Sequence, residues 1–509
     1  MKKLNQLKAG SILSYIQMAL SVVVELVFTQ AMIKALGQSE YGLYNTVAST
    51  ISMLSILSLG FNSSYVRYYA RYKASGDKDS IQKLNGMFLI VFAVIGLIAF
   101  VCGIYLTFHL NLVFDKGLSI EEYELAKTLM LLLTITLAIS FPMSVFGNII
   151  SAHENYVFLK LTGMLRTVLG PMISMPLLLL GFRSITLVAV SLVVSVFTDL
   201  CNLYYVLRKL KEKFVFHSFE KGVFKDLFIY TSFIAINIIV DQINTNVDNL
   251  LLARFKGTKE VAIYAVGQRL YTAYVRFSSA ISGVFTPRIH MILNTTNNEI
   301  QLKRKLTELF TKVGRIQFYI LTLVSTGIVF FGRAFISFWA GEGFENSYYV
   351  ALLLIIPGTI PLIQNLGIEI QRAENNHQFR SIAYLVMAFI NLFCSYYLCQ
   401  LYGAIGSTIG TALSLLLANG LIMNIYYHKK CNIDIIHFWK NIADISKGLL
   451  IPIICGIAMN SIVPTNTISS FFFAVIVYTA VFFVAMYLIS MNEFEKELIH
   501  KAVKKIITR

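Results

Sequence analysis

The feature that most constrains this chain is a series of apolar stretches, each long enough to cross a lipid bilayer. A hydrocarbon core of roughly 30 Å needs about 20 apolar residues of helix, and the sequence supplies about fourteen such stretches joined by short loops. We therefore predict an all-α polytopic membrane protein. The predicted spans are 9–33, 42–66, 85–108, 127–149, 157–181, 185–207, 227–253, 261–286, 313–332, 346–368, 381–400, 404–427, 448–463 and 469–490.

Lysine and arginine are concentrated in the loops of one side. Cytoplasmic loops carry the excess of basic residues, so we predict that both termini are cytoplasmic and that loops 34–41, 109–126 and 333–345 lie outside. This rule also explains the net charge of +16, so no nucleic-acid partner is predicted; anionic lipid head groups are the expected contacts. Two basic clusters illustrate the pattern: Arg67, Arg71, Lys73, Lys78 and Lys83 after the second span, and Arg208, Lys209, Lys211 and Lys213 after the sixth.

Composition supports the same class of protein. The 509 residues are 56% hydrophobic and only 14% charged, which is too apolar for a soluble protein of this size. The six cysteines form no CxxC pair and the eight histidines are scattered, so neither a disulfide framework nor a metal site is predicted. No phosphate-binding G-x-x-x-x-G-K-[ST] loop and no soluble domain are found. We therefore predict no cofactor and no catalytic activity.

An internal repeat divides the chain. A constant offset of 220 residues relates equivalent loop positions, and two copies of a six-span bundle with the same orientation are expected. We predict a first lobe over 1–208, a cytoplasmic linker over 209–226, a second lobe over 227–430 related by a pseudo-two-fold axis, and two extra helices with a basic tail over 431–509. The repeated residues are Gly37, Glu40 and Tyr44 with Gly257, Glu260 and Tyr264, and Glu154-Asn155 with Glu374-Asn375; Pro142 falls within one residue of Pro361.

The seventh span contains the densest set of polar residues. At about 100° per residue, Asp241, Asn244, Thr245 and Asp248 share one face of a helix. Polar groups inside a membrane usually face a bundle interior or a watery cavity. One interpretation is a cavity-lining helix with a proton or cation site at Asp241 or Asp248. The other is a structural polar seam that hydrogen-bonds to neighbouring helices.

Arginines in the eighth span suggest a phosphate site. Arg269 and Arg276 are two helical turns apart on one face, and a guanidinium presents a fork that suits phosphate oxygens. The pair is a candidate diphosphate clamp, although it could equally neutralise the acids of the seventh span, and the two roles are compatible. Arg166 in the fifth span adds a further positive group, and Glu25 and Gln30 give the first span a polar face.

Two sets of short motifs occur, one in each copy of the repeat. The first is Ala35 to Tyr44 (ALGQSEYGLY), followed by Leu59-Gly60-Phe61 and Tyr65-Val66-Arg67, and the second is Val247 to Leu252 (VDNLLL), followed by Tyr264 and Thr286-Pro287-Arg288. These motifs resemble bacterial polysaccharide-biosynthesis exporters, the Wzx-type flippases of the multidrug/oligosaccharidyl-lipid/polysaccharide superfamily. The likeness extends over essentially the whole chain, and Ala262 departs from it where the family commonly has the glycine that Gly42 keeps in the first copy.

The resemblance implies two lobes around a cationic cavity in the bacterial cytoplasmic membrane. It implies that undecaprenyl-diphosphate-linked oligosaccharide crosses by alternating access, with Arg269, Arg276 and Arg166 near the diphosphate and Asn244 and Gln30 in the glycan cavity. Asp241, Asp248 and Glu25 are the expected coupling acids. A polysaccharide polymerase and glycosyltransferases are expected partners. A murein-precursor flippase and a multidrug antiporter remain alternatives from the superfamily, and a membrane glycan polymerase or glycosyltransferase is the alternative from another class.

Overall fold

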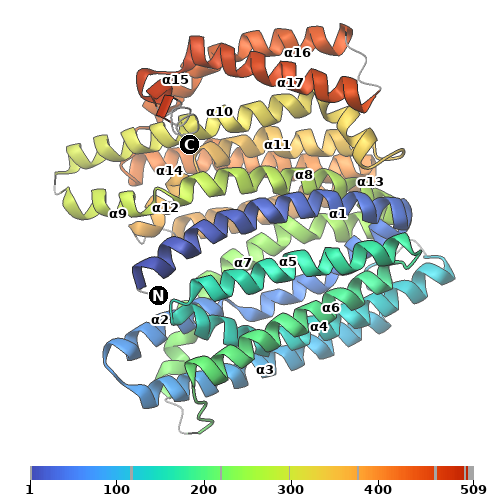
Figure 1. The fold of residues 1–509 in the computed structure, drawn as a ribbon, viewed down its shortest axis with the longest axis vertical. Coiled ribbons are helices and arrows are strands. Elements are labelled where there is room, and N and C mark those ends of the chain that lie inside the picture. The colour runs from blue at the N-terminus through green and yellow to red at the C-terminus, as the bar shows by residue number, and fades with distance from the viewer. Residues whose placement is uncertain are drawn as a thin grey trace. The chain divides into compact units, whose positions relative to one another are not determined.

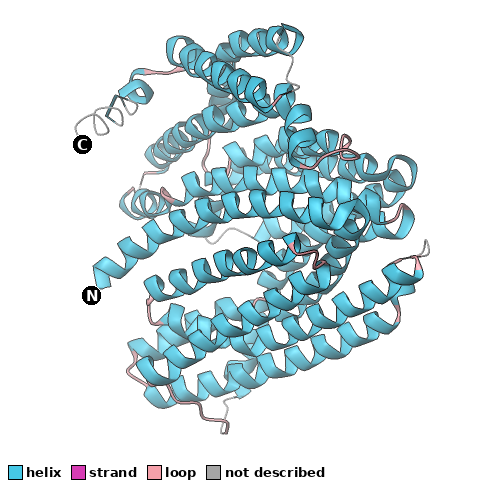
Figure 2. Cartoon of the chain, turned by 45° about the vertical axis from the view of Figure 1, so that its right-hand side comes forward, coloured by secondary structure: helices cyan, strands magenta, loops and turns pink. Residues whose placement is uncertain are grey.

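The computed structural model describes residues 3–114, 118–217, 221–296, 298–374, 378–462, 467–497 and 500–501 (Figure 1). These residues are helical almost throughout, and no strand occurs among them (Figure 2). The predicted all-α fold is therefore confirmed. Asn375, which the repeat pairs with Asn155, and most of the predicted basic tail fall outside the described ranges.

The chain forms two compact units. The first comprises Met1–Ala265 with Tyr384–Ser407, and the second comprises Val266–Ala383 with Thr408–Arg509, so that α8 and α13 each contribute to both. The lobe boundaries predicted at 1–208 and 227–430 stay a prediction. The helices that begin in the first unit are α1 (Lys3–Met53), η1 (Leu54–Ser58), α2 (Phe61–Ala74), α3 (Lys78–Phe108), η2 (Leu110–Leu112), α4 (Ile120–Ala152), α5 (Tyr156–Leu179), α6 (Ser184–Tyr204), η3 (Tyr205–Leu210), α7 (Lys221–Phe255) and α8 (Thr258–Gly283).

The remaining helices follow α8 along the chain, and all but part of α13 belong to the second unit. They are α9 (Thr286–Thr295), α10 (Glu299–Trp339), α11 (Ser347–Ile363), α12 (Leu366–Ala373), α13 (Gln378–Leu415), η4 (Leu416–Ile422), α14 (Met423–Lys430), α15 (Ile435–Ser446), η5 (Lys447–Leu449), α16 (Leu450–Ile462), α17 (Ile468–Ala485) and η6 (Met486–Ser490).

The predicted spans fall mainly on helical residues, but several extend over more than one helix, so helices and spans do not correspond one to one. By length and composition, 9 helical segments of the described residues could cross a membrane, or up to 10 if α11 and α12, bent by 44°, form one span. The continuous α1 and α13 each include one predicted span and the beginning of the next, and each helix is kinked between the two, at Gly37 or Gly403. α10 begins well before the span predicted at 313–332, since its first turns are helical but polar.

The kink at Gly37 reverses the chain. Gly37 has φ 73°, a conformation that suits glycine because it lacks a Cβ. Before it, Gln6 accepts a hydrogen bond from the backbone N–H of Val157, and well after it the hydroxyl of Tyr69 lies 2.9 Å from His153. Ser39 instead donates to Glu122, at the opposite end of α4. The two parts of α1 are therefore antiparallel, as expected for separate spans.

Matching hydrogen bonds support the internal repeat. The carboxylate of Glu40 accepts a 2.9 Å bond from the backbone N–H of Ser184, and Glu260 accepts a 2.7 Å bond from Ala404. Donor and acceptor are 144 residues apart in both cases. Because Glu40 and Glu260 are also the residues that the sequence repeat pairs, the same contact occurs once in each copy.

The two copies meet where α1 crosses the first turns of α8. A Cβ on Gly42 would overlap the carbonyl oxygen of Thr258 and lie 3.2 Å from the backbone nitrogen of Ala262. The hydroxyls of Ser39 and Thr258 are 2.8 Å apart at the same crossing. Gly42 and Ala262 are equivalent positions of the repeat, and they face each other at this crossing. The helices can approach this closely because the residue at position 42 is glycine.

Residues 211–217, which follow η3, form a docked strap along α3. The backbone N–H of Val215 donates a 3.0 Å hydrogen bond to the carbonyl of Gln82. Gly86 permits this approach, because a Cβ there would overlap the carbonyl oxygen of Val215. The part of the predicted linker that precedes 218–220, which lie outside the described residues, is thus fixed to the first unit.

Side chains also hold the strap. Glu212 pairs with His153 at 2.9 Å and accepts a 3.1 Å hydrogen bond from Asn85. Asn85 in turn accepts a 2.6 Å bond from the hydroxyl of Tyr65. The strap therefore connects α2, α3 and the end of α4 at the predicted inner end of the unit.

Candidate functional site

The polar face of α7 passes from the surface into the core of the first unit. Asp241 and Thr245 are exposed, Asn244 is half-buried, and Asp248 is only 2% exposed. A lone carboxylate in such a setting is costly unless donors compensate it. The contacts of Asp248 therefore decide what this face can do.

Two hydroxyl groups satisfy Asp248. Tyr264, on the first turns of α8, donates a 2.8 Å hydrogen bond to one carboxylate oxygen, and Ser407, on α13, donates a 2.5 Å bond to the other. Tyr264 is one of the residues matched by the sequence repeat, although its role as a donor to this acid was not expected. Three helices thus converge on one buried charge.

Amide and hydroxyl groups extend this arrangement. Asn391 of α13 donates to Asn244 at 3.2 Å and accepts a 3.1 Å bond from Ser395. The structure therefore brings two predicted site residues, Asn244 and Asp248, to the same pair of helices, α7 and α13. We call the six residues Asn244, Asp248, Tyr264, Asn391, Ser395 and Ser407 the Asp248 network.

The Asp248 network is composed of oxygen-bearing groups. Carboxylate, amide and hydroxyl oxygens are the ligands that small hard cations prefer, and a buried carboxylate is also a potential proton acceptor. Among the described residues no group of three or more His, Cys, Asp or Glu could hold a metal ion. The groups of the network are thus of the types that accept a proton or bind a small hard cation.

Arg269 and Arg276 lie on α8 in the second unit, and both are partly buried. Their helix packs through a different face. Tyr274 donates to the carbonyl of Leu321 on α10, and a Cβ on Gly267 would lie 2.5 Å from Val350 on α11.

Arg269 follows the contact residue Gly267 by two positions, and Arg276 follows the contact residue Tyr274 by two positions. Two positions correspond to about 200° of rotation around a helix, so each arginine lies on nearly the opposite side of α8 from that contact. The arginine pair consequently points away from α10 and α11. Arg269 and Arg276 therefore share one face of α8, opposite to its contacts with α10 and α11.

Arg166 lies on α5 in the first unit. It donates a 2.6 Å hydrogen bond to the hydroxyl of Ser195 on α6. Asp199, one turn further along α6, acts on Arg166 electrostatically. The other predicted residues of this unit, Glu25 and Gln30, are half-buried on α1, which packs along α5.

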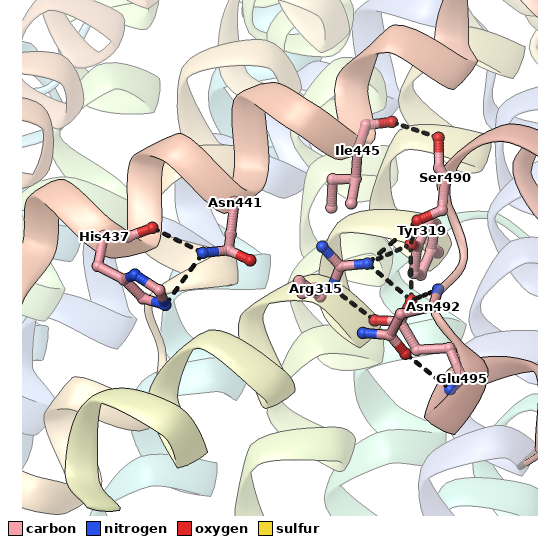
Figure 3. Close-up of polar contacts among 8 residues, drawn as sticks. All are labelled: Arg315, Tyr319, His437, Asn441, Ile445, Ser490, Asn492 and Glu495. Atoms are coloured by element: carbon pink, nitrogen blue, oxygen red, sulfur yellow. Dashed lines mark hydrogen bonds and ion pairs between the residues drawn. The ribbon is translucent and has the colours of Figure 1, made fainter. Parts of the chain in front are cut away.

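Sequence reasoning missed Asp199, although a signal was present. It is the single acidic residue of the span predicted at 185–207, and ionisable residues inside membranes are usually functional. It also missed a buried cluster in the second unit, shown in Figure 3. There Arg315 of α10 donates 2.6 and 2.8 Å bonds to Glu495, which follows α17.

We call the ion pair of Arg315 and Glu495 the Arg315–Glu495 clasp. Both of its charged groups have further hydrogen-bond partners. Tyr319 donates a 3.0 Å bond to Glu495, the backbone N–H of Asn492 donates one of 2.9 Å, and Arg315 also bonds the carbonyl of Ser490 at 3.1 Å. Burial opposes the charge of Glu495, but the hydrogen bonds from Arg315 and Asn492 outweigh it and lower the pKa of that carboxyl. Complete satisfaction indicates a structural contact rather than a site that awaits a ligand.

These features define a class, a polytopic helical membrane protein with ionisable residues on helices inside its two units. Residues 7–293 match the model of the polysaccharide biosynthesis protein family, so the chain belongs to that family. No curated protein sequence matches the chain significantly.

Solved structures show the same fold. The chain is similar to the lipid II flippase MurJ in an inward closed conformation (16% identity, TM-score 0.70, 96% of this chain and 99% of that one). It is also similar to an inward-facing multidrug resistance MATE family transporter of the MOP superfamily (15%, 0.64, 84% and 99%). A MOP superfamily transporter from Pyrococcus furiosus is also similar, with 15% identity and a TM-score of 0.59 over 84% of this chain and 99% of that one. The chain therefore has the fold of MOP transporters.

Proposed function

We propose that this protein is a flippase that moves undecaprenyl-diphosphate-linked oligosaccharide across the bacterial cytoplasmic membrane by alternating access. Both termini are cytoplasmic in this proposal, and a polysaccharide polymerase and glycosyltransferases act on the same glycan. Transport rather than catalysis is the assigned activity, so the chain is not an enzyme. Membership of the polysaccharide biosynthesis family supports a glycan as the cargo.

The observation that carries the proposal is the arginine pair of α8. Arg269 and Arg276 are partly buried, and they share the face of α8 opposite to its contacts with α10 and α11. A diphosphate can leave water only if fixed positive charge and hydrogen-bond donors replace its hydration. A cationic drug would be repelled by the same pair. We therefore assign Arg269 and Arg276 to the diphosphate, together with Arg166 of the first unit.

The glycan is assigned to polar groups of the first unit, Asn244 and Gln30. Coupling is assigned to the acids Asp241, Asp248 and Glu25. Of these, Asp248 is favoured because its network consists of oxygen ligands for a proton or a small cation. Binding of that ion would remove the charge that Tyr264 and Ser407 now compensate.

The test is surface glycan display by a host that lacks its own flippase. Arg269→Ala and Arg276→Ala are each expected to abolish display while the protein still inserts and accumulates. Arg→Lys variants should restore display only in part, because lysine keeps the charge but loses the planar fork.

Arg333→Ala is the matched control, because Arg333 is an exposed arginine of the second unit that contacts Tyr349 rather than the arginine pair. It should display glycan normally. Full display by the double variant Arg269→Ala with Arg276→Ala, at parental protein level, would contradict the proposal.

A murein-precursor flippase is the second candidate. The similarity to the lipid II flippase MurJ extends over 96% of this chain, against 84% for the MATE transporter. This difference favours a lipid-linked cargo over a drug. Rescue of a host depleted of its lipid II flippase, without rescue of polysaccharide display, would select this candidate.

A further inference from the structure

Arg166 is held differently from Arg183, an ion-paired arginine of the same unit. Its direct partner is a hydroxyl, that of Ser195, which is 2% exposed on α6. Arg183, which immediately precedes α6, contacts the carboxylate of Glu40 directly at 2.8 Å. The charge of Arg183 is thus neutralised by a carboxylate in direct contact, whereas Arg166 contacts an uncharged hydroxyl group.

The charge nearest to Arg166 on α6 is Asp199. It follows Ser195 by four residues, so both lie on one face of α6, toward α5. The effect of Asp199 on Arg166 is electrostatic and does not involve a hydrogen bond between them. Asp199 is half-buried in the unit.

This spacing has a physical consequence. A guanidinium alone inside a membrane is costly, so a nearby carboxylate stabilises it there. A direct ion pair would also occupy the fork that a phosphate needs. A carboxylate at a distance supplies the stabilising field and leaves part of the fork available.

We propose that Asp199 and Ser195 position Arg166 as a releasable anion-binding group for the phosphate of the lipid-linked cargo. The inference rests on the function proposed above and adds Asp199 as a positioning residue. While the cargo is absent, Asp199 balances the charge of Arg166. When the phosphate binds, the two anions compete for one cation, which keeps the affinity low enough for release.

Binding of undecaprenyl diphosphate to the purified full-length protein in detergent tests the proposal. Asp199→Asn removes the competing charge and is expected to tighten binding by about tenfold, within the usual range for two coupled sites. The gain should disappear in Arg166→Ala with Asp199→Asn, because the arginine that benefits is gone. Turnover by Asp199→Asn should fall, since release becomes slower.

Three controls separate this role from a structural one. Asp199→Glu retains the charge and should bind as the parent does. Glu40→Gln removes one negative charge at a contact pair and should leave affinity unchanged, which excludes a general effect of net charge. Uncharged undecaprenol should bind equally to all variants. Where Asp199→Asn does not accumulate, Asp199→Ser is the second neutral variant, with the same expectation.

Failure of the inference and failure of the function give different results. If the parent binds undecaprenyl diphosphate and Arg166→Ala weakens it, but neutral variants of Asp199 bind as the parent does, only the positioning role is wrong. If Asp199→Glu tightens binding as much as Asp199→Asn, the effect is not electrostatic and the inference is overturned. If the parent does not bind this lipid at all, the proposed function itself fails.

Discussion

Asp248 shows how hydroxyl donors can stabilise a buried carboxylate in a helical membrane protein. Each of its two carboxylate oxygens accepts a hydrogen bond from a hydroxyl group, one from Tyr264 and the other from Ser407. Hydroxyl donors stabilise the anion without adding a counter-charge, so a proton or a cation can still alter the balance. A structural seam and a coupling site are therefore compatible at this position.

Substitutions at Asp248 should separate these roles. Asp248→Asn keeps an acceptor oxygen and is expected to fold but to lose the dependence of transport on pH or sodium. Asp248→Ala leaves two buried donors unpaired, at about 1–3 kcal/mol each, and should lower the melting temperature. Thermal melting and transport at several pH values and sodium concentrations provide the measurements.

Asp241 offers the control for Asp248, because it is exposed on the same face. Asp241→Asn should leave the melting temperature unchanged. If Asp248→Asn transports with the parental pH and sodium dependence, the residue is structural only.

Gly42 and Ala262 make a second prediction at this scale. Gly42→Ala places a Cβ against the backbone carbonyl of Thr258, and overpacking of this kind costs about 1–3 kcal/mol. Ala262→Gly removes a methyl group and should cost about 1 kcal/mol through helix propensity. Melting of both variants in detergent measures the difference; equal destabilisation would argue against the close crossing.

At the scale of elements, the Arg315–Glu495 clasp joins α10 to the segment that follows α17. Both side chains are nearly inaccessible, at 9% and 5%. Removal of one member of such a buried pair is strongly destabilising, since the other charge is left uncompensated. The extra helices after the second repeat are thus anchored to α10 at their end.

The clasp should make stability depend on pH. Because the pKa of Glu495 is lowered on folding, its stabilisation is complete above the ordinary value of 4.5 and is lost as pH falls through the folded pKa. Melting below about pH 4.5 should therefore fall more steeply for the parent than for Glu495→Gln.

Arg315→Ala is the companion variant and should lose about 3–5 kcal/mol at neutral pH. Parallel pH profiles of the parent and Glu495→Gln would show that the clasp contributes little to stability.

Hydropathy predicted where the helices lie better than it predicted where they end or which distant residues they contact. The span predicted at 313–332 lies within α10, which extends from Glu299 because amphipathic helix continues beyond the apolar core. The contact between Arg315 and Glu495 joins residues 180 apart, and that between Asp248 and Ser407 joins residues 159 apart. Local periodicity shows that a residue faces inward but not which distant residue it meets. Asp199, in contrast, could have been found from its span alone.

At the scale of the whole chain, one pair of hydrogen bonds matches the internal repeat. Glu40 and Glu260 bond backbone N–H groups that lie equally far along the chain, at Ser184 and Ala404. The predicted orientation places these bonds outside the membrane and the strap of residues 211–217 inside. Both copies then close the same end of the bundle with the same type of bond.

Single-cysteine labelling should establish this orientation. In a background without the six native cysteines, a cysteine at the exposed Arg183 should react with an impermeant maleimide in intact cells. A cysteine at the exposed Lys211 should react only after permeabilisation. Labelling of position 211 in intact cells would reverse the proposed topology.

The docked strap has a consequence for any division of this gene. Through Glu212 and Val215 the covalent joint between the repeats is bonded to the first unit. A protein made as two polypeptides would need a first piece that extends through residue 217. A piece that ended at Tyr204 would lack Glu212, the residue that contacts His153 and Asn85.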